Sequence, residues 1–137
     1  MANDEKIKET FEVSVDKDSK IISIIFLKGF EIEDSIRRSE LVREAVFEIL
    51  DKSPNVQYKA FINLIDLKGK GGGDLACPES KEIYRQIVQD KRLGQVAILL
   101  SNPVLEILGG LVAKSANAGE KVKFFSNKEQ ALNWLGV

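Results

Sequence analysis

The chain lacks histidine altogether and has a single cysteine, Cys77, among its 137 residues. Without histidine, neither a Ser-His-Asp nor a Cys-His catalytic arrangement can form, and the commonest general base is missing. A zinc site of the ordinary kind is excluded too, because it needs several cysteine or histidine ligands. One cysteine cannot build a disulfide framework within the chain. We therefore expect a protein that is not an enzyme and that carries no metal or other cofactor.

An excess of one charge and long apolar runs are also missing. The 20 lysines and arginines nearly balance the 21 acidic residues, which leaves a net charge of −1. Such a chain has no electrostatic reason to bind nucleic acid. No stretch approaches the roughly 18 apolar residues of a membrane-spanning helix, and the polar start of the chain does not resemble a signal peptide. We expect a cytoplasmic protein with no nucleic-acid partner and no integral membrane association.

The apolar content is sufficient for one hydrophobic core. Apolar residues make up 44% of the chain, and its length is typical of one domain. Residues 1–7 are mostly polar and are expected to form a flexible tail. Residues 8–137 then form the single domain.

The spacing of apolar residues predicts strands and helices in alternation. Residues 11–15 and 21–27 are apolar runs separated by a polar turn, which predicts a hairpin. Later strands are expected over 58–66, 95–100 and 121–125, and helices over 33–52, 78–91, 103–116 and 127–135. Alternation of this kind is typical of parallel strands joined by crossover helices. The sequence predicts an α/β fold with a mixed five-stranded sheet and four helices.

Two local signals mark where helices begin. Pro78 suits the first turn of the second helix, because proline lacks the N–H that this turn leaves unpaired. Ser126 and Glu129 have the spacing of a capping box, which predicts that Ser126 starts the last helix.

The predicted strand over residues 21–27 is apolar on both faces. Its side chains are those of Ile21, Ile22, Ile24, Ile25, Phe26 and Leu27. Apolar surface of this extent has to be covered. A crossing helix of the same chain, a second copy in a homodimer, or a lipid-like ligand would each cover the second face, and the sequence leaves all three open.

A glycine-rich loop follows the strand over 58–66 and precedes a helix, where open α/β sheets bind ligands. Backbone N–H groups in such a loop can form a nest for an anion. The loop matches neither a P-loop nor a dinucleotide-binding motif, and a plain connector explains it as well. The residues after the fourth strand are expected at the same sheet edge, where helix capping is the alternative explanation. The candidate ligand- or partner-binding residues are Asp66, Lys68, Lys70, Gly71, Gly72, Asp74, Ser101 and Asn102.

The order of elements and the last segment resemble the STAS domains, and more closely the SpoIIAA-like proteins. The resemblance is carried by a strand ending in Phe124-Phe125, then Ser126, then a short helix with Ala131-Leu132. It implies the SpoIIAA-like fold and a non-enzymatic regulatory or protein-interaction role. This branch of the family has been likened to lipid-binding domains, which implies the alternative of a carrier or sensor of a small apolar ligand.

In the anti-sigma-factor antagonists of this family, a serine in an Asp-Ser-Ser-Gly motif is phosphorylated. The matching stretch here is Asp74-Leu75-Ala76-Cys77, in which only the aspartate is kept. Leu75 and Ala76 have no hydroxyl to accept a phosphate, so the usual phosphorylation switch is not expected. Ser80 is a displaced candidate, but we expect its side chain to face solvent on the following helix.

Overall fold

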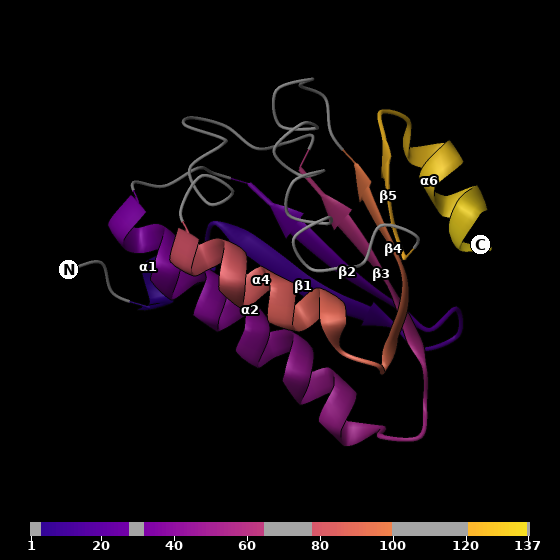
Figure 1. Ribbon diagram of the computed structural model, residues 1–137, viewed down its shortest axis with the longest axis horizontal. Coiled ribbons are helices and arrows are strands. Elements are labelled where there is room, and N and C mark those ends of the chain that lie inside the picture. The colour runs from indigo at the N-terminus through magenta and orange to yellow at the C-terminus, as the bar shows by residue number, and fades with distance from the viewer. Residues whose placement is uncertain (1–3, 28–31, 65–77, 100–120, 137) are drawn as a thin grey trace.

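The computed structural model describes residues 4–27, 32–64, 78–99 and 121–136. They form a twisted sheet flanked by helices (Figure 1). The strands are β1 (Phe11–Asp16), β2 (Ile21–Phe26), β3 (Tyr58–Asn63), β4 (Leu93–Leu99) and β5 (Val122–Phe125). The helices are α1 (Asp4–Lys8), α2 (Ile32–Lys52), α4 (Pro78–Gln89) and α6 (Lys128–Leu135).

The sheet has the predicted mixed character. β1 pairs antiparallel with β2, whereas β2 with β3, β3 with β4 and β4 with β5 are parallel pairs. The spatial order β1-β2-β3-β4-β5 is also the order along the chain, with β5 at one edge. The expected α/β fold with a five-stranded mixed sheet is therefore confirmed.

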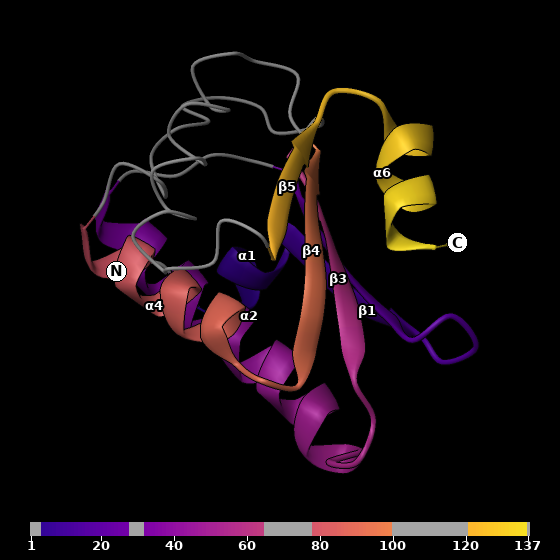
Figure 2. The same ribbon diagram turned by 45° about the vertical axis from the view of Figure 1, so that its right-hand side comes forward.

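The helices lie on both faces of the sheet. Figure 2 shows α1, α2 and α4 on one side and α6 on the other. α2, α4 and α6 match predicted helices, and Pro78 is the first residue of α4 as expected. The helix predicted over 103–116 lies outside the described residues.

The expectation of a flexible tail over residues 1–7 is wrong from residue 4 onward. Residues 4–8 form α1, whose Ile7 is 1% exposed and belongs to the main core. The guanidinium of Arg37 in α2 donates to both carboxylate oxygens of Asp4, at 2.9 and 2.7 Å. Tertiary contacts therefore stabilise a helix that is too short to be stable by itself.

The start of α6 also differs from the prediction by one residue. Asn127, rather than Ser126, is the N-cap, and its side-chain oxygen accepts a hydrogen bond from the backbone N–H of Gln130. Asparagine is among the preferred capping residues, so the physical role is the expected one at a neighbouring position.

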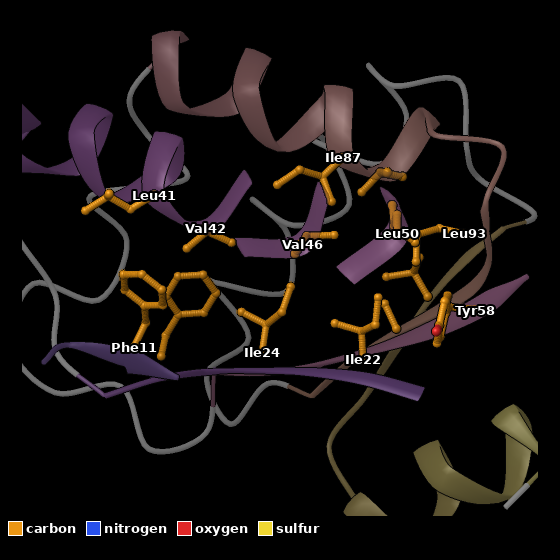
Figure 3. Close-up of a cluster of buried hydrophobic side chains, with 14 of the residues drawn as sticks. Phe11, Ile22, Ile24, Leu41, Val42, Val46, Leu50, Tyr58, Ile87 and Leu93 are labelled. Carbon is orange, nitrogen blue, oxygen red and sulfur yellow. The ribbon is translucent and has the colours of Figure 1, made fainter. Parts of the chain in front are cut away.

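The main hydrophobic core lies between the sheet and the α2–α4 layer. Figure 3 shows Ile22 and Ile24 of β2 pointing toward Val42 and Val46 of α2. Ile22, Val42 and Val46 have no exposed surface. These positions alternate along the strand and recur at helical spacing on α2, which is why they meet across one interface.

A second, smaller core lies on the opposite face, beneath α6. It consists of Ile21, Phe61, Ala97, Leu99, Ala131 and Leu135. The ammonium of Lys59 in β3 donates to the carbonyl of Leu135 at 2.6 Å, which attaches the end of α6 to the sheet. A crossing helix of the same chain therefore covers Ile21 on the second face.

Replacing Leu135 with alanine tests this second core. Leu135 is 1% exposed, so Leu135→Ala should lower the free energy of unfolding by about 3 kcal/mol. Asn133→Ala, at an exposed position of the same helix, is the matched control and should change it by less than about 0.5 kcal/mol. Urea unfolding followed by circular dichroism measures both. Equal stability of the two variants would show that α6 does not contribute to the core.

Candidate functional site

All eight candidate binding residues from the sequence lie in residues 65–77 and 100–120, outside the described part of the chain. They are Asp66, Lys68, Lys70, Gly71, Gly72, Asp74, Ser101 and Asn102. Their grouping at one sheet edge stays a prediction, and Cys77 lies outside the described residues too. That sheet edge is the one at which the parallel strands end. The described side chains there belong to the ends of β2 and β3 and to the beginnings of α2 and α4.

A buried arginine is the main polar feature of this edge. The side chain of Arg38, in α2, is 1% exposed. Its guanidinium carbon lies 5.1 Å from the ring centroid of Phe26, the last residue of β2. The Phe26 ring in turn meets Tyr84 of α4 edge to face, with centroids 6.1 Å apart. We call Phe26, Arg38 and Tyr84, which are joined by these ring contacts, the Arg38 cluster. Fully buried arginines are rare, and stacking on an aromatic ring is one way to stabilise the desolvated cation.

Three serines with no exposed surface lie on the same helices. Ser35 and Ser39 are on α2, and Ser80 is in the first turn of α4. The hydroxyl of Ser39 donates to the carbonyl of Ile36 at 2.7 Å. The hydroxyl of Ser80 has no hydrogen-bond partner within the described structure.

α2 and α4 pack against each other on one face of the sheet. Both helices connect parallel strands on the same side of the sheet, so they run in the same direction. A hydrogen bond from Arg43 of α2 to Gln86 of α4 fixes their register.

The expectation that Ser80 faces solvent is wrong. Ser80 shares one face of α4 with Ile83 and Ile87, and all three are buried. Ser80 lies about one helical turn before Ile83, so the spacing of the apolar residues could have indicated that Ser80 is buried. A kinase could not reach the Ser80 hydroxyl in this conformation, so the structure does not favour Ser80 as a displaced phosphorylation site.

Sequence reasoning also missed Arg38. Arg38 belongs to the stripe that Ser35, Ser39, Val42 and Val46 form on the buried side of α2. The helical spacing of these buried positions could have indicated that Arg38 is buried. The first turns of the stripe are polar, however, and a polar first turn is typical of a solvent-exposed helix end.

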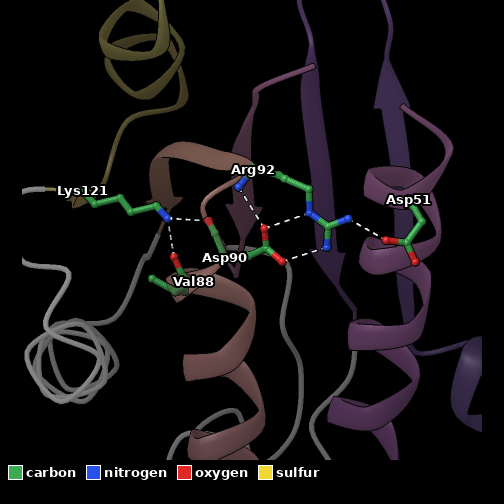
Figure 4. Close-up of polar contacts among 5 residues, drawn as sticks. All are labelled: Asp51, Val88, Asp90, Arg92 and Lys121. Carbon is green, nitrogen blue, oxygen red and sulfur yellow. Dashed lines mark hydrogen bonds and ion pairs between the residues drawn. The ribbon is translucent and has the colours of Figure 1, made fainter. Parts of the chain in front are cut away.

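A second polar cluster lies at the opposite edge of the sheet and joins four elements (Figure 4). The guanidinium of Arg92 donates to both oxygens of Asp90, at 3.0 and 2.8 Å, and also to Asp51 of α2. The ammonium of Lys121, just before β5, donates to the carbonyls of Val88 and Asp90. These contacts connect the ends of α2 and α4 to the starts of β4 and β5.

Electrostatics at this edge fit a structural role. Hydrogen bonds from Arg92 hold the pKa of Asp90 below its usual value. Burial lowers the pKa of Lys121, although the Asp90 carboxylate opposes that shift. Neither group is brought beside a nucleophile in the described structure. The described residues also hold no group of three or more acidic or cysteine side chains placed to bind a metal ion.

The Asp90 carboxylate should contribute stability that depends on pH. Because its folded-state pKa is lowered from 3.8, the unfolded chain binds this proton first as the pH falls. The contribution is therefore present above that value and is lost as the pH falls through the lowered pKa. Asp90→Asn should cost about 1 kcal/mol at pH 7, and the deficit should shrink below the pH at which Asp90 is protonated. Urea unfolding across acid pH measures this, with Asp18→Asn in the hairpin turn as control.

Removal of the unpaired Ser80 hydroxyl should stabilise the domain. A buried hydroxyl without a partner is unfavourable, and alanine is the better helix former, so Ser80→Ala should gain about 1 kcal/mol. Ser80→Glu would bury a carboxylate and should cost more than about 3 kcal/mol. The same substitutions at Ser14, which is exposed on β1, should be nearly neutral. A tolerated glutamate at position 80 would contradict the burial of this serine.

No family model matches the chain, and no curated protein matches it. A solved structure does: an uncharacterized protein of the DUF3478 family with a SpoIIAA-like fold, from Shewanella loihica PV-4. The two chains are 18% identical, the TM-score is 0.57, and the match covers 91% of each chain. A likeness at this identity concerns the fold alone. The chain therefore has a SpoIIAA-like α/β fold, in agreement with its order of elements and its last segment.

Proposed function

We propose that this chain is a non-enzymatic regulatory or protein-interaction module that acts in the cytoplasm. The supporting observation is that helices of the same chain cover both faces of the central strands. Ile22 packs in the main core below α2, and Ile21 packs in the second core below α6. The apolar strand surface thus stabilises the domain itself, and outer surfaces remain for recognition.

The sheet topology supports a role without a nucleotide cofactor. The five strands follow one another across the sheet in chain order. Doubly wound sheets bind dinucleotides in the crevice where the strand order reverses. Among the described strands the order contains no reversal of this kind.

The alternative function, a carrier or sensor of an apolar ligand, rests on the two apolar faces of residues 21–27 and on the likeness of this branch of the family to lipid-binding domains. Packing of Ile21 against Phe61 and Leu135 accounts for the second face at that residue. A homodimer is likewise not required to cover Ile21, whereas Ile25 on the same face is only partly buried. Of the described helices, none is long and apolar enough to cross a membrane.

The outer side of α2 has the character of a protein-binding surface. A shallow groove there is lined by Arg43, Glu44, Phe47, Glu48, Asp51 and Lys52. Phe47 is half-buried against the main core, whereas the Glu44 and Glu48 side chains are 62% and 68% exposed. An apolar centre with a charged rim is the usual anatomy of a protein interface.

Affinity purification from the source cells tests the proposed function. We expect the tagged chain to retain one partner protein in stoichiometric amount, and the pair to co-elute on size-exclusion chromatography. A double reversal of charge, Glu44→Lys with Glu48→Lys, should weaken retention at least about tenfold, because rim charges govern specificity and association.

The matched control reverses two charges on the hairpin turn, far from α2. Lys17→Glu with Lys20→Glu should leave partner retention within about twofold of the unmodified chain. A chain that elutes as a monomer with no co-purifying protein, across growth conditions, would contradict the proposed function. Equal loss in both double variants would contradict the α2 surface.

A further inference from the structure

We propose that β1 is a docking strand: it binds an extended, basic segment of a partner protein, which adds to the sheet as a further strand. This goes beyond the proposed function, because it names a second surface, distinct from the outer side of α2, and the chemistry of the segment that fits it. Three observations support it: the open hydrogen-bonding side of β1, the contrast between the two edge strands, and the exposed acidic side chains of β1.

One side of the β1 backbone is open for hydrogen bonding. β1 is an edge strand that pairs with β2, and the N–H of Leu27 donates to the carbonyl of Thr10 at the end of this pairing. Hydrogen-bonded and non-hydrogen-bonded pairs alternate along antiparallel strands, so the even-numbered residues of β1 bond to β2. The N–H and C=O groups of Phe11, Val13 and Val15 point away from β2, and we call them the open side of β1. Within the described residues, these groups have no hydrogen-bond partner.

The two edge strands of the sheet differ in how well they are protected against a further strand. Proteins discourage such pairing with a short edge strand, a bulge, a proline or a lysine. β5, at one edge, has four residues and carries an exposed lysine, Lys123. β1, at the other edge, has six residues, pairs with β2 in an unbroken register, and contains neither proline nor lysine. β1 is therefore the better suited of the two to receive another strand.

The side chains of β1 determine which segment fits. Glu12, Ser14 and Asp16 are exposed on one face of the sheet, whereas Val13 and Val15 on the other face pack partly against the main core. An added strand has the same alternation, so each of its faces meets one of these two rows. Lysine or arginine beside the acidic row, and valine, isoleucine or threonine beside the valine row, give favourable cross-strand pairs.

The same charges oppose the pairing of β1 with a second copy of itself. In antiparallel pairing through the two open sides, Glu12 lies opposite or diagonal to Glu12 or Asp16 of the copy. Carboxylates at such cross-strand positions repel one another. The occupant that fits this edge is therefore a different, basic chain.

Titration with a synthetic peptide tests the proposal. The probe is the capped peptide Lys-Val-Lys-Thr-Lys-Val, which alternates basic and β-branched residues, and the control peptide has glutamate in place of each lysine. Each peptide is added to the full chain labelled with ¹⁵N, and NMR follows the backbone amide shifts and the exchange of amide hydrogens with deuterium. We expect saturable binding of the basic peptide with a dissociation constant below about 1 mM, and binding at least about tenfold weaker for the acidic peptide.

Amide exchange distinguishes strand addition from attraction by surface charge. The N–H groups of Val13 and Val15 should exchange at least about fivefold more slowly with the basic peptide bound, because they gain hydrogen bonds. The N–H groups of Glu12 and Ser14 face β2 and should change less. A peptide held only by charge would not produce this alternation along β1.

Substitutions at Ser14 assign the binding to β1. Ser14→Lys places a positive charge within the acidic row and should weaken binding of the basic peptide at least about threefold, whereas Ser14→Glu should tighten it about twofold to fivefold. Ser14 is exposed, so both variants should fold like the unmodified chain, and their NMR spectra check this. Glu129→Gln, which removes a negative charge from an exposed position of α6, is the control and should stay within about twofold.

Three results would overturn the proposal: no saturable binding of the basic peptide, equal affinity for the acidic peptide, or slower exchange spread evenly along β1. A dimer of the unmodified chain on size-exclusion chromatography that Ser14→Lys dissociates would also overturn it, since the occupant of this edge would then be a second copy. No natural partner is present in this titration, so its failure would leave the proposed function standing, and the reverse also holds.

Discussion

The whole domain depends on the enclosure of β2 and β3 between two layers of helices. Side chains alternate across a strand, so residues 21 and 22 lie on opposite faces, and each face needs its own cover. α2 and α4 cover the face of Ile22, and α6 covers the face of Ile21. The polar clusters at the two sheet edges are organised around this arrangement, because they lie where the helices of the larger layer begin and end.

Most of the fold follows from sequence patterns that report local physics. Apolar runs and alternating apolar residues predicted all five strands, and proline at the start of α4 marked that helix correctly. α1 was missed because its sequence, DEKIK, holds a single apolar residue, Ile7. Only its docking in the core and the Asp4–Arg37 ion pair make it a helix. Contacts between residues far apart in the chain cannot be predicted from a short segment of sequence.

The candidate site was less accessible to sequence reasoning. Charged, polar and glycine residues in loops could be chosen from the sequence as candidate binding residues, but they lie outside the described residues. The buried polar residues that the structure does describe at the starts of α2 and α4 include Arg38 and Ser80, residue types that are usually exposed. Their burial is set by which side of α2 and α4 meets the sheet near the helix ends. Buried apolar residues such as Val42 in α2 and Ile87 in α4 show which face of each helix is buried, but the first turns of the two helices lack such residues.

The agreement between strand order and chain order has a consequence for how the protein is made. As the chain leaves the ribosome, the β1–β2 hairpin is complete before β3 appears, and each later strand adds to the edge formed by its predecessor. No strand has to insert between two that are already paired. Because α6 follows all five strands and covers the second face, that face is enclosed only after the sheet is complete.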